Sequence, residues 1–208
     1  MAITAVPIQP VSTTSGNQYR ARRVIEESAQ TFKLGTPVAV AGADGGIIAW
    51  GGATLTGAVG SPAGISYEAA SNLSATGAGA PQPNQPFTGL GATVTFGSVP
   101  NQSAAKNIPH GAPLNDGRVG FFVTSGDIVY SATLGNAGNF ANWSDALLST
   151  NPQVGLTIDT GGNFWYADLA KSGATAAFQL VGRDLRDPIG SGNRVLVRFI
   201  PGNVQILT

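Results

Sequence analysis

Cysteine is absent from this chain, histidine occurs once, and charged residues make up only 11% of its 208 positions. Without cysteine the chain has no disulfide and no thiolate ligand or nucleophile, so it is indifferent to the redox state of its surroundings. The small number of titratable groups leaves little means of proton transfer, metal binding or covalent catalysis. We therefore expect a protein that is not an enzyme, with no catalytic residue, no cofactor and no metal.

An excess of charge of either sign is also missing, because 11 basic residues balance 11 acidic ones. A neutral chain creates no long-range field that would attract nucleic acid or an anionic membrane. The sequence has no run of about 18 apolar residues, and no basic segment followed by an apolar stretch stands at its start. These features predict no nucleic-acid partner, no contact with a membrane, and synthesis in a cytoplasm.

Glycine and proline, in contrast, are abundant, with 29 and 13 residues. They divide the large apolar residues into short runs, several of which alternate with polar residues, as in Val195, Val197 and Phe199. Such alternation is typical of half-buried strands, and glycine and proline are typical of the turns between them. The pattern predicts an all-β fold, an antiparallel β-barrel or sandwich with hairpins at residues 118–130 and 155–166, and a short helix at 144–149.

The chain is expected to form one β-rich domain, residues 24–208, preceded by an extended N-terminal arm, residues 1–23. The arm is uncharged over most of its length and contains two prolines, which favour extended backbone. Its removal over residues 2–18 is expected to leave the fold intact. A stretch at about 71–117 is rich in glycine and proline and poor in large apolar residues, which predicts a loop-rich insertion.

The candidate catalytic and metal-binding residues each have a simpler structural interpretation. His110 is the only imidazole, and it lies in a proline-flanked loop with no Gly-x-Ser-x-Gly elbow anywhere in the sequence. Asp184 and Asp187 form a close acidic pair, but neighbouring arginines favour local ion pairing over an acid–base dyad. The turn at 159–163 holds oxygen ligands suited to calcium and equally describes an ordinary hairpin turn.

Aromatic residues suggest a different kind of site. Trp143, Trp165 and Tyr166 could form a platform on which a sugar ring stacks. Because side chains alternate along a strand, Trp165 and Tyr166 would face opposite ways, so one of the two is expected in the core or in a subunit contact.

Four segments carry a resemblance to a known family. Glu27–Val38 (ESAQTFKLGTPV), followed by Ala63–Ala70 (AGISYEAA), resembles the strand–turn–strand of tailed-bacteriophage capsid decoration, or cement, proteins and related small virion proteins. Val181–Gly190, closing on Asn193–Pro201, is similar to the end of the same group. Together the segments cover about a fifth of the chain.

The resemblance implies a β-rich structural protein on the capsid surface of a virion, made in the host cytoplasm. Members are often trimers that bridge neighbouring major capsid subunits, so the expected partners are the major capsid protein and further copies of this chain. Residues 24–70 and 178–208 would form the β-barrel core. The arm would contact the partner through its apolar residues and a basic cluster: Ile3, Val6, Ile8, Val11, Arg20, Arg22 and Arg23.

Two other functions remain open from the sequence. The chain could be a receptor-binding or carbohydrate-binding module of a head fibre or tail, with Trp143, Trp165 and Tyr166 as its platform. It could also be a hydrolase that uses His110, or Asp184 with Asp187. Of the three, the noncatalytic decoration protein is the leading hypothesis, because stabilising an assembled shell requires contact area rather than titratable groups.

Overall fold

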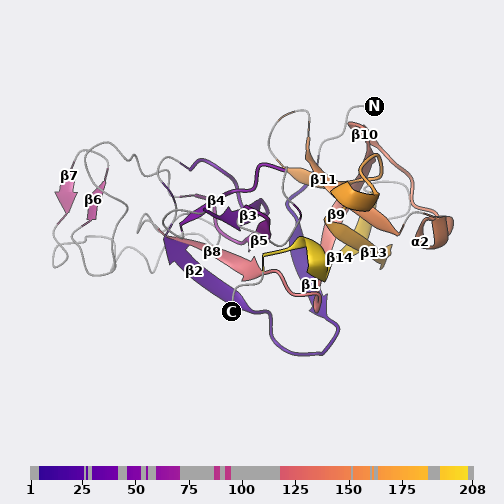
Figure 1. The fold of residues 1–208 in the computed structure, drawn as a ribbon, viewed down its shortest axis with the longest axis horizontal. Coiled ribbons are helices and arrows are strands. Elements are labelled where there is room, and N and C mark those ends of the chain that lie inside the picture. The colour runs from indigo at the N-terminus through magenta and orange to yellow at the C-terminus, as the bar shows by residue number, and fades with distance from the viewer. Residues whose placement is uncertain are drawn as a thin grey trace.

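The computed structural model describes residues 5–25, 27, 30–41, 46–52, 55, 60–70, 87–89, 92–94, 118–150, 152–159, 161, 164–186 and 193–205. Within these ranges the regular elements are nearly all strands, with one short helix, α2 (Ala146–Thr150), close to the predicted position (Figure 1). The all-β class expected from the alternating apolar residues is thereby confirmed.

A closed, mixed β-barrel forms the C-terminal part of the molecule (Figure 1). The ring closes because β9 hydrogen-bonds with β12 and also with β14, the two ends of the series β12-β11-β13-β14. The β9–β12 pair is parallel, whereas the other pairs in the ring are antiparallel. The ring strands are β9 (Ile128–Asn136), β11 (Gln153–Ile158), β12 (Trp165–Asp168), β13 (Phe178–Arg183) and β14 (Arg194–Phe199).

Two more strands extend this barrel. The short β10 (Asn139–Phe140) folds back on the end of β9. The strand β1 (Gln9–Thr13) pairs antiparallel with the first half of β9, on the edge opposite to β14. Two 3-10 turns complete this part, η2 (Gly173–Thr175) before β13 and η3 (Pro201–Asn203) after β14.

A five-stranded antiparallel sheet lies beside the barrel, with strand order β2-β8-β5-β3-β4 (Figure 1). Its strands are β2 (Ala21–Ile25), β3 (Pro37–Val40), β4 (Ile47–Ala49), β5 (Pro62–Ser66) and β8 (Arg118–Val123). The β3–β4 hairpin, in which Val40 lies opposite Ile47, corresponds to the predicted turn between these two apolar runs. A separate hairpin joins β6 (Phe87–Gly89) and β7 (Ala92–Val94) within the expected insertion.

Two large apolar cores and one small cluster, Ala5 with Tyr166, follow from this arrangement. The larger fills the barrel with residues such as Tyr130, Phe178 and Phe199 and continues across the junction into the five-stranded sheet through Ile65 and Trp50. Burial of this apolar surface is the main stabilising contribution. The smaller core lies on the other face of the sheet and contains Val38, Ile47, Ala63, Val119, Phe121 and Val123.

The expectation of a projecting N-terminal arm is wrong for the residues that the structure describes. Ile8 is only 1% exposed and belongs to the larger core. The backbone N–H of Ala5 donates to Asp159 (3.2 Å), and that of Val6 donates to Thr133 (3.2 Å). Because β1 satisfies its backbone groups on β9, the segment is integrated into the domain instead of extending from it.

Two details of the predicted β pairing are also corrected. The runs at 118–123 and 128–130 do not form a hairpin, because β8 pairs with β2 and β5 whereas β9 belongs to the barrel. Their apolar side chains face different cores, so the turn between them connects the two sheets. Residues 24–70 accordingly do not share one barrel with 178–208. The hairpin at 155–166 is confirmed, with Ile158 opposite Trp165.

Candidate binding surface

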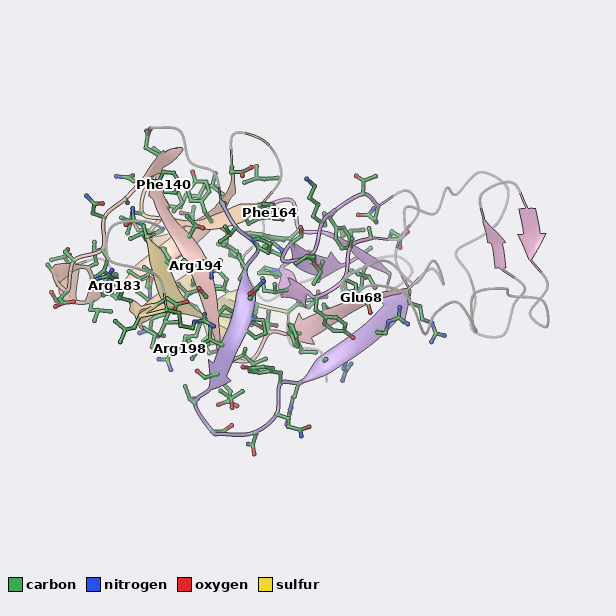
Figure 2. All side chains as sticks on the ribbon, turned by 180° about the vertical axis from the view of Figure 1, so that it is seen from behind. Glu68, Phe140, Phe164, Arg183, Arg194 and Arg198 are labelled. Atoms are coloured by element: carbon green, nitrogen blue, oxygen red, sulfur yellow. The ribbon has the colours of Figure 1, made fainter. Side chains whose placement is uncertain are left out.

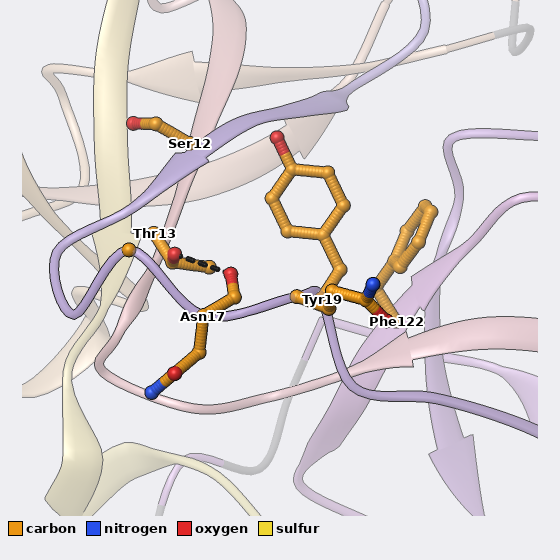
Figure 3. A pocket seen from close by; sticks show the side chains of 7 residues that line it. Ser12, Thr13, Asn17, Tyr19 and Phe122 are labelled. Atoms are coloured by element: carbon orange, nitrogen blue, oxygen red, sulfur yellow. Dashed lines mark hydrogen bonds between the residues drawn. The ribbon is translucent and has the colours of Figure 1, made fainter.

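A groove of about 570 Å³ opens where β1, the connection from β1 to β2, and β8 meet (Figure 3). The ring of Tyr19 stands in this groove between Ser12 and Phe122. Its other lining residues are small or polar. The lining as a whole consists of Ser12, Thr13, Gly16, Asn17, Gln18, Tyr19 and Phe122 and contains no charged residue.

The loop that forms one wall of the groove is fastened to the barrel by Asp127. The Asp127 carboxylate accepts hydrogen bonds from the hydroxyls of Thr14 and Ser15 (both 2.5 Å) and from the Ser15 backbone N–H (2.8 Å). These donors stabilise the ionised form, and the Ser15 and Thr14 hydroxyls are the main reason that the pKa of Asp127 is lowered. Within the loop, the Thr13 hydroxyl donates to the Asn17 carbonyl (2.6 Å).

An aromatic row continues from the groove along the face of β8 on which Phe122 packs against the larger core. The rings of Tyr19 and Phe122 are in edge contact, with centroids 5.6 Å apart, and Phe122 in turn contacts Tyr67 at 5.0 Å. The Tyr67 ring lies over Gly120, where any side chain would collide with it. Burial raises the pKa of Tyr67, with the neighbouring Glu68 carboxylate adding to the effect.

Arginines border this row along β2. Glu68 accepts the backbone N–H of Gly120 (2.9 Å) and forms an ion pair with Arg23 (3.2 Å), which ties β2 to the end of β5. Arg20 and Arg22 are exposed. Figure 2 shows Glu68 beside β2, whereas the labelled Arg183, Arg194 and Arg198 lie over the barrel. Tyrosine and arginine are enriched in protein interfaces, and the combination here has that chemistry.

Three buried carboxylates in the barrel are occupied by internal hydrogen bonds. Asp159 accepts from Ala5, Asp168 accepts from Ala137, Ala170 and Thr157, and Asp184 accepts from Ser131 and Arg186. Their geometry is that of structural acceptors that hold turns and strands together. Among the described residues, no group of three or more His, Asp or Glu side chains converges in a way that could hold a metal ion.

The Asp184–Arg186 pair predicts a loss of stability in acid. The Arg186 guanidinium donates to Asp184 through two nitrogens (2.9 and 2.6 Å), and this bonding holds the pKa of the carboxyl well below its usual value of about 3.9. The unfolded chain therefore takes up a proton first as the pH falls. The stabilisation is complete above the unfolded pKa and disappears as the pH drops through the lower folded pKa.

Urea unfolding of the parent and Asp184→Asn, from about pH 6 to about pH 2, checks this expectation. The difference in free energy of unfolding between the two proteins should shrink toward acid pH. An equal difference at both ends of the range would contradict the assignment.

The site residues predicted from the sequence lie in different environments in the structure. Val6 and Val11 are half-buried, Arg20 and Arg22 are exposed, and Arg23 is paired with Glu68. Ile3, His110 and Asp187 lie outside the described residues. The ion pair expected near Asp184 is present.

The aromatic platform expected on the barrel is not formed, because two of its three side chains are buried. Trp165 is 9% exposed and packs on Trp50 with ring centroids 5.5 Å apart, and Tyr166 is 1% exposed. Trp143 is half-buried, and its indole N–H donates to Asp145 (3.0 Å). These residues are not brought together as an exposed stacking surface, because both strand residues face into packed regions.

The sequence pattern did not lead to a prediction of the groove, although the alternation in one strand indicated one of its residues. In the run at 118–123, Val119, Phe121 and Val123 alternate onto the face of the smaller core, which leaves Phe122 on the opposite face, where it packs against the larger core. Phe122 is only partly buried there, and Tyr19 and Tyr67 pack against its ring.

No protein-family model, curated protein or solved structure matches this chain. No helix within the described ranges has the length and hydropathy needed to cross a membrane. The surface is therefore interpreted from its own contacts and chemistry.

Proposed function

We propose that this protein is a noncatalytic virion structural protein that binds the outside of a phage capsid and stabilises the assembled shell. The observation that carries the proposal is the way two of the segments resembling decoration proteins meet in space. The end of Glu27–Val38 lies in β3 and the start of Ala63–Ala70 lies in β5, with Pro37 opposite Ile65 and Val38 opposite Gly64. The described residues of these two segments thus form one packed unit.

Hydrogen bonds outside the ladder reinforce this unit. The Gly35 N–H donates to the Ser66 carbonyl (2.8 Å), the Thr36 N–H to the Ser66 hydroxyl (3.1 Å), and the Ala70 N–H to the Phe32 carbonyl (2.9 Å). The C-terminal segments that carry the resemblance contribute residues 181–183 to β13 and residues 194–199 to β14, which pair in the barrel. A rigid scaffold of this kind can present a fixed surface to a partner at low entropic cost.

The partner surface that we assign is the exposed edge of β2, with Arg20, Arg22 and the adjoining Tyr67. A ligand that binds the assembled shell but not its free subunits stabilises the shell by mass action, by about 2.7 kcal/mol per site at a hundredfold excess over Kd. Association of this chain as a trimer, which we also propose, would let three modest contacts act together.

Charge reversal at the β2 edge tests the proposal. Arg20→Glu combined with Arg22→Glu is expected to weaken binding to purified heads about tenfold, because each arginine would be replaced by a repelling charge at the contact. Sedimentation of labelled protein with heads from the phage that carries the sequence measures the occupancy. Arg183→Glu reverses one charge over the barrel and is the matched control for each of the single variants, Arg20→Glu and Arg22→Glu, that make up the double variant.

Two results would overturn the proposal. One is the absence of the unaltered chain from purified particles, together with no binding to heads that lack it. The other is equal loss of occupancy for the β2 variant and the Arg183→Glu control, which would show that the edge of β2 is not the surface that contacts the capsid.

A further inference from the structure

We propose that the groove around Tyr19 is a binding site for a neutral carbohydrate of one or two sugar rings. This inference goes beyond attachment to a capsid and does not depend on it. The groove has a volume of about 570 Å³, within the range of roughly 300–1,000 Å³ usual for small-molecule sites. It is formed by a segment at the junction of the two sheets, where binding sites are often found.

The charge of the lining selects a neutral ligand. The seven lining residues include no acid, no base and no histidine. The nearest anchored carboxylate, Asp127, already accepts hydrogen bonds from Thr14 and Ser15. A phosphate or carboxylate ligand would find no counter-charge among the lining residues, and the charge of the nearby Arg20 is shared with Asp127, whose pKa it helps to lower.

The polar groups of the lining match a polyhydroxylated ring. Ser12 and Tyr19 offer hydroxyls, and Gln18 offers an amide with both donors and an acceptor. Within the described part of the chain, none of these three side chains makes a hydrogen bond, so each is available to a ligand. A purely apolar occupant would leave these groups unpaired, at a cost in free energy.

The aromatic part of the lining supplies the second element of sugar recognition. Tyr19 is 37% exposed, and its ring stands upright in the groove against Phe122 (Figure 3). The C–H face of a sugar ring is apolar and packs on such an aromatic surface, while the hydroxyls at its rim form hydrogen bonds. One aromatic wall with polar groups opposite is the arrangement that this ligand needs.

The site is already organised without a ligand. Asp127 fastens Thr14 and Ser15, Thr13 holds the backbone of Asn17, and Phe122 supports the ring of Tyr19. Fewer groups must therefore be ordered when a ligand binds, which favours measurable affinity for a small molecule.

Saturation-transfer NMR with the full chain tests the inference. The probes are glucose, galactose, mannose and N-acetylglucosamine, their β-linked disaccharides, and the same sugars attached to a glycan array. Transfer to at least one sugar is expected, with affinity lowered about tenfold by Tyr19→Ala and largely kept by Tyr19→Phe, which retains the ring. Trp143→Ala is the matched aromatic control on the barrel and should bind as the parent does.

The comparison of free with attached sugars distinguishes two sources of the ligand. Binding to free and attached sugars alike supports a site for a single sugar unit, and binding only to attached glycans supports the same site with a surface polymer as its source. The inference is overturned if no probe binds the parent, or if Tyr19→Ala binds unchanged while its circular dichroism and thermal midpoint match the parent. Loss of binding in Trp143→Ala alone would also overturn it, because it would place the ligand on the barrel.

Discussion

Replacing Ile8 by alanine is expected to lower the free energy of unfolding by about 2–5 kcal/mol. The side chain is 1% exposed and packs in the larger core together with residues from both sheets. Its truncation removes apolar contacts and leaves a cavity that the surrounding strands cannot fill, because strand pairing holds them in place. Urea denaturation followed by tryptophan fluorescence measures the change.

Val11→Ala is the matched control, since Val11 lies on the same segment but is only half-buried. It should cost about 1 kcal/mol or less. Equal stability of Ile8→Ala and the parent would show that the segment is a detachable arm after all. Deletion of residues 2–18 removes Ile8 and β1 together, so it is expected to unfold the domain and cannot serve as a test of attachment alone.

Replacing Asp168 by alanine is expected to destabilise the barrel by about 3 kcal/mol or more. One carboxylate oxygen accepts the backbone N–H groups of Ala137 and Ala170 (both 3.0 Å), and the other accepts the hydroxyl of Thr157 (2.7 Å). Asp168 is buried, so alanine would leave several donors unpaired away from water. Chemical denaturation at neutral pH measures the loss.

Asp145→Ala provides the comparison, because Asp145 is exposed and accepts a single hydrogen bond from Trp143. Its loss should cost about 1 kcal/mol or less. Asp168→Asn keeps one oxygen acceptor and should lie between the two. If Asp168→Ala were as stable as Asp145→Ala, the carboxylate would not be holding the turn after β9.

Local patterns in the sequence were sufficient for the class of fold and for several elements. Alternation assigned Val195, Val197 and Phe199 to the core, and all three are fully buried in β14. The hairpin at 155–166 and the helix near 146 were signalled by turn residues and a polar cap. In each case the interactions that decide the structure lie within a few residues of one another.

The sequence did not predict correctly which strands pair with one another. Nothing local distinguishes a free arm from β1, because its partner β9 lies far along the chain. Trp165 looked like a surface platform because its partner Trp50 belongs to the other sheet. The groove could not be predicted for the same reason, since Phe122 lies far along the chain from Ser12 and Tyr19 and only the fold brings it to them.

The pairing of β9 with four other strands has a consequence for how the chain acquires its structure. Gln9 pairs with Ser131 and Arg22 with Phe121, so both early strands are made long before their partners leave the ribosome. The barrel strands, in contrast, follow one another from residue 128 onward and have mostly near neighbours as partners. Because long loops are slow to close, the barrel can nucleate first and recruit the N-terminal strands afterwards. Strands β1 and β2 must therefore wait for their partners through most of the synthesis of the chain, whereas β3, β4 and β5 can pair with one another as soon as they have been made.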